Sequence, residues 1–219
     1  MEQMSILTPQ QKQILDQIEK SQFIVSNFYF TGGTVLSEFY LKHRYSEDLD
    51  FFSEEKFDFD LVLMEINKWA KDLNFTFTRQ VKEVVDIYIL KFNDKDTLKL
   101  DFGYYPYRRV GKSIKYQEIT VDSEFDIAIN KLATINQRSS VKDFVDLYFL
   151  LDKFTIWDLM EGVKVKFRME LEPWLLGSDL EYAAKDFENL PRMIKPLTLE
   201  KLKFFFRQEA RELGQKAVA

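Results

Sequence analysis

Hydrophobic and polar positions change their spacing along the chain, and this pattern divides it near residue 122. Before that point, strand-like runs rich in β-branched and aromatic residues predict strands leading into Gly32 and over residues 45–53, 75–81, 84–92 and 97–103. Helical spacing there predicts helices over 8–21, 34–42 and 58–73. After residue 122 the spacing is helical throughout. We expect helices over 122–137, 141–152, 154–167, 179–188 and 197–213, with Glu172-Pro173 as a separator.

This order of elements predicts an α+β protein. A small mixed β-sheet with flanking helices would occupy residues 1–122, and an α-helical domain that completes a cleft would occupy residues 123–219. No internal repeat or low-complexity segment interrupts either half.

A glycine pair stands where the first predicted strand meets a helix, in the segment 28–34. Backbone N–H groups at Gly32 and Gly33 can approach a phosphate closely in such a turn, and the start of a helix favours an anion. Thr34 adds a hydroxyl group. The alternative is a plain turn.

Acidic side chains mark the next predicted strand. Asp48, Asp50 and Phe52 share one strand face, so the two carboxylates lie roughly 6.5–7 Å apart along the backbone and repel each other unless a cation or water separates them. Asp101, on a later strand, shares its face with Lys99. Asp101 either pairs with that lysine or serves as a third metal-binding carboxylate. For Asp48 and Asp50, the alternative to metal binding is that they are ordinary solvated acids.

Composition restricts the metal to one with oxygen ligands. The 219 residues include no cysteine and one histidine, which excludes disulfides, iron–sulfur clusters and cysteine-based zinc sites and favours Mg²⁺ or Mn²⁺. With 46% hydrophobic and 31% charged residues, no membrane-length apolar run and no signal-peptide pattern, we expect a soluble cytoplasmic protein without membrane contact. The net charge of −5 argues against binding nucleic acid through bulk electrostatics but allows a local basic patch.

Residues 104–117 form such a patch in sequence. Four basic residues alternate with four tyrosines and no acid: Arg108, Arg109, Lys112, Lys115, Tyr104, Tyr105, Tyr107 and Tyr116. Basic groups with stacking aromatics suit single-stranded RNA or a nucleotide. A solvated hairpin is the alternative.

Two predicted helices of the second half place a lysine opposite acids. Lys131 and Arg138 lie close to one helical face, and Asp143 and Asp146 are neighbours on the next helix. Lys131 could form a plain salt bridge with either acid, or it could reach a triphosphate while the acids orient it or take part in chemistry.

Several of these motifs, in this order, resemble those of the AbiEii-type nucleotidyltransferases, toxins of abortive-infection and related toxin–antitoxin systems. The first motif is similar over residues 31–36 and 43–52, and the downstream motifs over Asn130-Lys131-Leu132-Ala133 with Arg138 and over residues 142–147. Together they span roughly residues 28 to 151.

The resemblance implies transfer of a nucleoside monophosphate from a nucleoside triphosphate to an acceptor hydroxyl. In some members of the family the acceptor is the 3′ end of transfer RNA; an antitoxin encoded nearby is also implied. It implies metal binding by Asp48, Asp50 and Asp101, and essential roles for Lys131 and an aspartate, for which Asp146 is the first choice over Asp143. The predicted nucleotide-binding residues are Gly32, Gly33, Thr34, Arg44, Ser46 and Lys131. The alternatives are a non-catalytic nucleotide-binding or partner-binding module on the same fold, and a phosphohydrolase.

Overall fold

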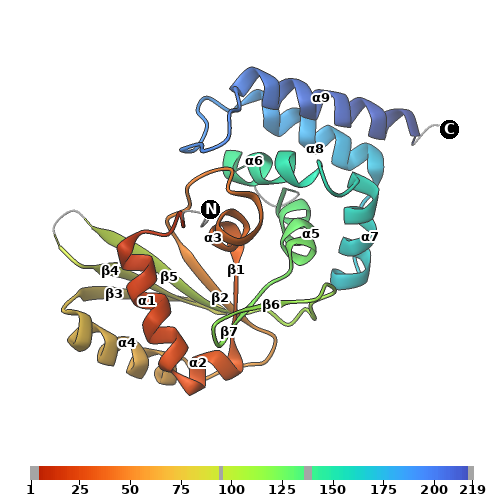
Figure 1. Cartoon of the computed structure of the whole chain (residues 1–219). Coiled ribbons are helices and arrows are strands. Elements are labelled where there is room, and N and C mark those ends of the chain that lie inside the picture. The colour runs from red at the N-terminus through yellow and green to blue at the C-terminus, as the bar shows by residue number, and fades with distance from the viewer. Residues whose placement is uncertain (1–4, 94–95, 136–139, 217–219) are drawn as a thin grey trace. The chain divides into compact units, whose positions relative to one another are not determined.

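The computed structural model describes residues 5–93, 96–135 and 140–216, and the chain folds into two compact units (Figure 1). The sheet unit comprises Met1–Tyr40, Ser46–Arg108 and Lys112–Ser123. The helical unit comprises Leu41–Tyr45, Arg109–Gly111 and Glu124–Ala219. The chain therefore contributes two short segments from the first half to the helical unit.

The described part of the sheet unit contains a mixed seven-stranded sheet in the order β3-β4-β5-β2-β1-β7-β6. Its strands are β1 (Tyr29–Thr31), β2 (Leu49–Ser53), β3 (Thr76–Lys82), β4 (Val85–Lys91), β5 (Thr97–Tyr104), β6 (Ile114–Tyr116) and β7 (Ile119–Val121). The pairs β2–β5 and β1–β7 are parallel and the other neighbours antiparallel. The α+β prediction with a mixed sheet is thus confirmed.

One face of this sheet forms the core of the unit. Leu49 and Phe51 of β2 and Leu100 and Phe102 of β5 are buried, and Phe51 stacks on Phe102. Alternation places Asp50 and Asp101 on the opposite face. The candidate acids therefore stand on the face that the hydrophobic core does not use.

Helices α1 (Pro9–Lys20), α2 (Gln22–Asn27) and α4 (Phe59–Leu73) lie together beside the sheet in Figure 1. Thr8 caps α1 as predicted, with a capping box to Gln11. The predicted end near Ser21 is confirmed, but α2, for which Ser21 is the N-cap, was not predicted. The helix predicted over 34–42 is α3 (Gly32–Val35) followed by a π-helix, η1 (Leu36–Leu41).

The helical unit consists, in its described part, of α5 (Glu124–Ile135), α6 (Val141–Leu150), α7 (Ile156–Phe167), α8 (Pro173–Lys185) and α9 (Leu199–Lys216). Helix α5 contacts α6 and α7, and α8 packs along α9 (Figure 1). Glu172 lies between α7 and α8, so the predicted separation of two helices is confirmed, but the predicted start of the second helix at 179 was wrong by six residues. Pro173 begins α8, because the first turn of a helix needs no backbone N–H from it.

A buried carboxylate fastens one of the short segments of the helical unit. Asp126 of α5 accepts hydrogen bonds from the backbone N–H groups of Val110 (2.9 Å) and Gly111 (2.7 Å), and it pairs with Lys166 of α7 at 2.8 Å. Both charged side chains are buried. This pair is therefore part of the fold of the helical unit.

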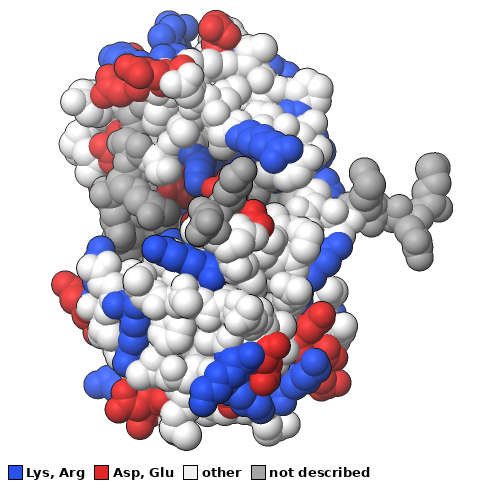
Figure 2. Space-filling view, turned by 90° about the vertical axis from the view of Figure 1, so that its left-hand side faces the viewer, with Lys and Arg blue, Asp and Glu red and all other residues white. Residues whose placement is uncertain are grey.

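The surface carries mixed charge. On the face shown in Figure 2, Lys and Arg side chains are interspersed with Asp and Glu. Within the described residues, no helix combines the length and hydropathy that crossing a membrane requires.

Candidate active site

The Asp50 side chain lies directly against Gly32 at the start of α3. Gly32 has φ +81°, a backbone conformation that favours glycine, and a Cβ there would lie 2.2 Å from Oδ2 of Asp50. The antiparallel register of β1 and β2 places Thr31 beside Asp50. A side chain at position 32 would therefore displace the carboxylate.

Asp101 lies beside Asp50 on the neighbouring strand. The parallel register of β2 and β5 pairs the two residues, and Oδ2 of Asp101 forms an ion pair with Nζ of Lys99. Its other oxygen, Oδ1, is buried and has no hydrogen-bond partner among the described residues. Both alternatives for Asp101 are thus compatible with the structure, since one oxygen pairs with the lysine and the other is available to a ligand.

The pKa values of Asp101 and Lys99 reflect the other acids of this group. Burial raises the pKa of Asp101, the negative charge of Asp48 raises it further, and Lys99 opposes both. The pKa of Lys99 is raised although burial acts to lower it, because Asp101, Asp50 and Asp48 all favour its charged form. One ammonium group therefore interacts with three carboxylates.

Two side chains hold the backbone that carries Asp48. The Thr34 hydroxyl donates to the carbonyl oxygen of Asp48, and Nε2 of Gln11 donates to the carbonyl oxygen of Ser46 at 3.0 Å. Both are buried. Thr34, predicted to bind nucleotide, thus contacts the acidic segment. The role of Gln11 was not predicted from the sequence. The only sign of it there is that a polar residue lies on the apolar side of α1.

The ligand set suits a hard divalent cation in chemistry but is not assembled in advance. Asp48 and Asp50, both partly exposed, and the unpartnered Oδ1 of Asp101 supply only oxygen, which Mg²⁺ prefers. Among the described residues, however, no three acidic or histidine side chains are already spaced to hold a metal ion.

The remaining predicted residues, Arg44, Lys131 and Asp146, belong to the helical unit. With His43 and the alternative acid Asp143 they form what we call the buried ion cluster. Asp146 Oδ1 receives hydrogen bonds from Nε2 of His43 (2.7 Å) and Nε of Arg44 (2.6 Å). Its Oδ2 receives the second Arg44 nitrogen at 2.8 Å. Because an ionised carboxylate only accepts, Nε2 of His43 carries the proton.

Lys131 completes this cluster. Its Nζ lies 2.6 Å from Oδ2 of Asp146 and 2.7 Å from Oδ1 of Asp143. Burial acts to raise the pKa of Asp146, but Lys131 and Arg44 outweigh it and hold the pKa well below its usual range. Burial lowers the pKa of His43. The salt bridge predicted for Lys131 is present, and it involves both acids.

The structure therefore groups the predicted residues into two sets. Gly32, Gly33, Thr34, Ser46, Asp48, Asp50 and Asp101 belong to the sheet unit, and Arg44, Lys131 and Asp146 to the helical unit. Arg138 and the turn residues Asp94 and Lys95 lie outside the described residues.

A family model described as nucleotidyl transferase AbiEii toxin, type IV toxin–antitoxin system, matches residues 13–219. The chain belongs to the AbiEii family. It is therefore a member of a nucleotidyltransferase toxin family, as the motifs predicted. An uncharacterized protein of Aquifex aeolicus, aq_aa25, is 32% identical over 213 residues, which cover 94% of this chain and 97% of that protein.

Solved structures support the fold of this AbiEii protein. A Helicobacter pylori protein proposed to be a nucleotidyltransferase has a TM-score of 0.60 at 21% identity, covering 97% of this chain and 98% of its own. The nucleotidyltransferase toxin MenT4 of Mycobacterium tuberculosis has a TM-score of 0.52 at 14% identity, and the match covers 94% of this chain and 86% of MenT4.

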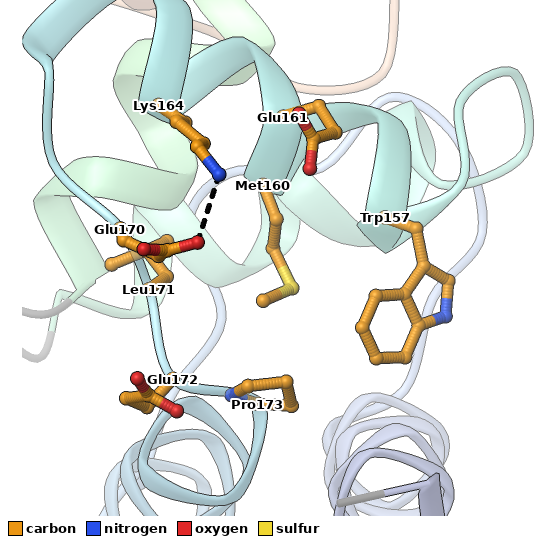
Figure 3. A pocket seen from close by; sticks show the side chains of 8 residues that line it. All are labelled: Trp157, Met160, Glu161, Lys164, Glu170, Leu171, Glu172 and Pro173. Carbon is orange, nitrogen blue, oxygen red and sulfur yellow. Dashed lines mark hydrogen bonds and ion pairs between the residues drawn. The ribbon is translucent and has the colours of Figure 1, made fainter.

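A pocket of about 240 Å³ lies elsewhere in the helical unit, between α7 and the start of α8 (Figure 3). Met160 and Trp157 point into the region from α7, and Lys164 pairs with Glu170 at 2.8 Å at its rim. None of the predicted site residues lines it, so the pocket is separate from both sets of candidate residues.

Proposed function

We propose that this AbiEii protein is an active, Mg²⁺-dependent nucleotidyltransferase that moves a nucleoside monophosphate from a nucleoside triphosphate to a hydroxyl group of RNA. One observation carries the proposal: Asp50 and Asp101 are paired on adjacent parallel strands next to a glycine turn, and Oδ1 of Asp101 is buried without a hydrogen-bond partner among the described residues. Buried polar atoms are normally paired, and exceptions of this kind mark sites completed by a ligand.

In this proposal Asp48, Asp50 and Asp101 hold the metal. When bound, Mg²⁺ neutralises charge on the triphosphate and on the departing pyrophosphate. The oxygen-only ligand set and the orphaned Oδ1 support this assignment.

Asp101, as one of these ligands, also helps to position the attacking hydroxyl group, whose proton is released to solvent. The hydroxyl oxygen forms a bond with the α-phosphorus, the bond between that phosphorus and the bridging oxygen breaks, and pyrophosphate leaves. Lys99, paired with Asp101, stabilises its ionised form.

Gly32 and Gly33 bind phosphate oxygens through backbone N–H groups, and Ser46 extends this set. Lys131 adds a positive charge to the triphosphate. Its ammonium has three N–H bonds, and those directed at Asp143 and Asp146 fix its position. Because Asp146 is fully engaged by Lys131, Arg44 and His43, we assign it to orienting Lys131. Arg44 contributes indirectly, through Asp146.

The finer partners follow from the family. We propose the 3′ end of transfer RNA as the acceptor and an antitoxin protein as the restraint on activity, in the cytoplasm. MenT4 is a nucleotidyltransferase toxin, which supports a nucleotide substrate here.

The test is incubation of the purified protein with total transfer RNA, Mg²⁺ and each of the four α-labelled nucleoside triphosphates in turn. We expect label in RNA with one or more nucleotides, and none with the Asp48→Ala/Asp50→Ala double variant or with EDTA. Label from the α-phosphate that stays in free nucleotide would indicate a phosphohydrolase instead.

Normal transfer by the double variant would refute the metal-binding assignment. If the wild type labels no RNA, a thermal shift with Mg²⁺ and nucleotide separates two alternatives. A binding module without activity is stabilised by about 2.7 kcal/mol when the ligand is present at about 100 times its Kd, whereas a partner-binding protein is not stabilised.

A further inference from the structure

A row of aromatic side chains continues from the acidic face of β2 into the segment that follows β5. Phe52 and Tyr105 have ring centroids 5.0 Å apart with planes inclined by only 32°. Tyr105 and Tyr107 are also 5.0 Å apart, edge to face. We call Phe52, Tyr105 and Tyr107 the aromatic row. All three residues belong to the sheet unit.

The backbone fixes the position of this row. The N–H of Tyr105 donates to the carbonyl oxygen of Ser53 at 2.7 Å, and the N–H of Tyr107 donates to that of Tyr105 at 2.8 Å. Gly103 is paired with Phe52 across β2 and β5. A Cβ at Gly103 would come within 3.0 Å of the Phe52 ring, so the glycine leaves the space that the ring occupies. The rings are thus held by strand pairing and hydrogen bonds.

The row begins next to the proposed catalytic carboxylates. Phe52 follows Asp50 by two positions on the same strand face, a separation of roughly 7 Å along the backbone. Gly103 continues the face of Asp101 along β5, and Tyr105 follows directly after the strand ends at Tyr104. A chain bound along the row would therefore have one end close to Asp101, which is proposed to position the acceptor hydroxyl group.

The segment that carries Tyr105 and Tyr107 is basic in sequence, although Glu54 and Glu55 follow Ser53 at the end of β2. Residues 104–117 contain four basic and no acidic side chains, and those of Arg108, Lys112 and Lys115 are exposed. Tyr107 is itself 38% exposed. In a protein of net charge −5, a segment of this sign next to half-exposed aromatic rings is complementary to a phosphate backbone with unpaired bases.

From these observations we propose that the aromatic row binds unpaired bases at the acceptor end of a single-stranded RNA, with Arg108 and Lys112 contacting its phosphates. This inference rests on the proposed function for the direction of the strand. Single-stranded RNA is the ligand because stacking on Tyr107 requires a base face that a duplex keeps covered. The structure thus assigns to the 104–117 segment the positioning of the acceptor, separately from the chemistry at the carboxylates.

The test measures binding of a short 5′-fluorescein-labelled oligoadenylate to the full chain by fluorescence anisotropy, with EDTA and without nucleotide. Tyr107→Ala should raise the Kd about 5- to 150-fold, the range expected for loss of one base–aromatic stack. Tyr107→Phe keeps the ring and should change the Kd by less than about twofold. Tyr182→Ala is the matched control, since Tyr182 is 70% exposed on α8, and it should bind like the wild type.

Two results would overturn the inference: equal affinity of wild type and Tyr107→Ala, or equal affinity of wild type for the oligoadenylate and for a blunt RNA hairpin. Failure of the wild type to bind the oligoadenylate would also overturn it. Because this assay contains no nucleotide, its outcome is independent of transfer. Loss of labelling activity with intact stacking would refute the proposed function alone, and unchanged binding by Tyr107→Ala with full labelling activity would refute the aromatic row alone.

Discussion

The carboxylates of the sheet unit and the buried ion cluster of the helical unit meet opposite electrostatic conditions. Asp48, Asp50 and Asp101 all act on one ammonium group, that of Lys99, and one Asp101 oxygen has no described partner. In the buried ion cluster two carboxylates face two permanent cations and a histidine whose pKa burial lowers. The first set thus contains a buried carboxylate oxygen without a hydrogen-bond partner among the described residues, whereas in the second set both oxygens of Asp146 are engaged by cations or by His43.

This difference distinguishes two aspartates whose roles cannot be told apart from the sequence motifs alone. Asp50 and Asp146 both fall in motifs shared with the AbiEii family, but their surroundings differ: Asp50 is partly exposed and Asp146 fully buried. A carboxylate with every oxygen engaged by cations is a poor base and an effective anchor. We therefore assign chemistry to the sheet unit and positioning to the buried ion cluster, and substitutions can test this division.

The largest expected effect is on stability. Asp146→Ala leaves Arg44 and Lys131 buried without their shared carboxylate, and breaking a buried pair in this way costs about 3–5 kcal/mol. We expect urea unfolding to show a lower midpoint with an unchanged slope. As a control, Glu170→Ala breaks the exposed pair with Lys164 and should leave the midpoint unchanged. An Asp146→Ala variant as stable as the wild type would mean that the cluster is not structural.

The next effect is on activity. Asp50→Asn keeps the size of the side chain and removes a charge that the neighbouring acids repel, so we expect the unfolding free energy to stay within about 0.5 kcal/mol. Labelling of RNA should fall about 10²- to 10³-fold, the scale for losing one group that stabilises charge in a transition state. Glu47→Gln is the matched control, since Glu47 is exposed in the same segment. Equal losses in both variants would remove the distinction between Asp50 and its neighbour.

Local patterns in the sequence were sufficient to predict much of the fold. The strands β3, β4 and β5 were placed to within two residues because alternating side chains reflect one buried and one open face. The Lys99–Asp101 pair was foreseen as an alternative because residues two apart on a strand share a face. The π-helical turn η1 was not predicted, because apolar spacing over six residues does not distinguish it from an α-helix.

The buried ion cluster could be predicted only in part. Lys131 and its acids lie on successive helices, so their meeting followed from helix geometry. His43 and Arg44 come from Leu41–Tyr45, a segment that belongs to the helical unit while both its neighbours in sequence belong to the sheet unit. Ile194 and Lys195 donate backbone hydrogen bonds to the His43 carbonyl oxygen. Pairing across such sequence distances depends on the tertiary fold, which no local pattern encodes.

A smaller loss of stability is expected when the glycine turn beside Asp50 is changed. Gly32→Ala forces an L side chain into φ +81° and into Oδ2 of Asp50, at a cost of about 1–3 kcal/mol. Labelling activity should also fall, because the carboxylate must rotate away. Gly214→Ala is the matched control in α9, where a Cβ meets nothing within 4 Å, and it should stabilise the chain by about 0.4–1 kcal/mol. If Gly32→Ala retained full stability and activity, the close fit between Gly32 and Asp50 would not matter.

The smallest expected effect is the pH dependence of stability that His43 causes. His43 is the sole histidine in the sequence, and burial lowers its pKa from 6.5 in the folded state, against the support of Asp146. Below pH 6.5 the unfolded chain therefore binds more protons than folded His43 does, so the unfolding free energy falls as pH falls, by no more than about 1 kcal/mol from pH 6.5 to 5.5. Asp146 titrates in another pH range, because its pKa lies well below 3.8, and its contribution to stability is lost only at still lower pH.

Urea unfolding of wild type and His43→Gln across pH 5.5–8 isolates the histidine. The difference in unfolding free energy between the two proteins should be constant above pH 7 and shrink below pH 6.5. Parallel curves throughout would show that His43 is not held neutral, and that the buried ion cluster carries an excess positive charge instead of the balance that distinguishes it from the carboxylates of the sheet unit.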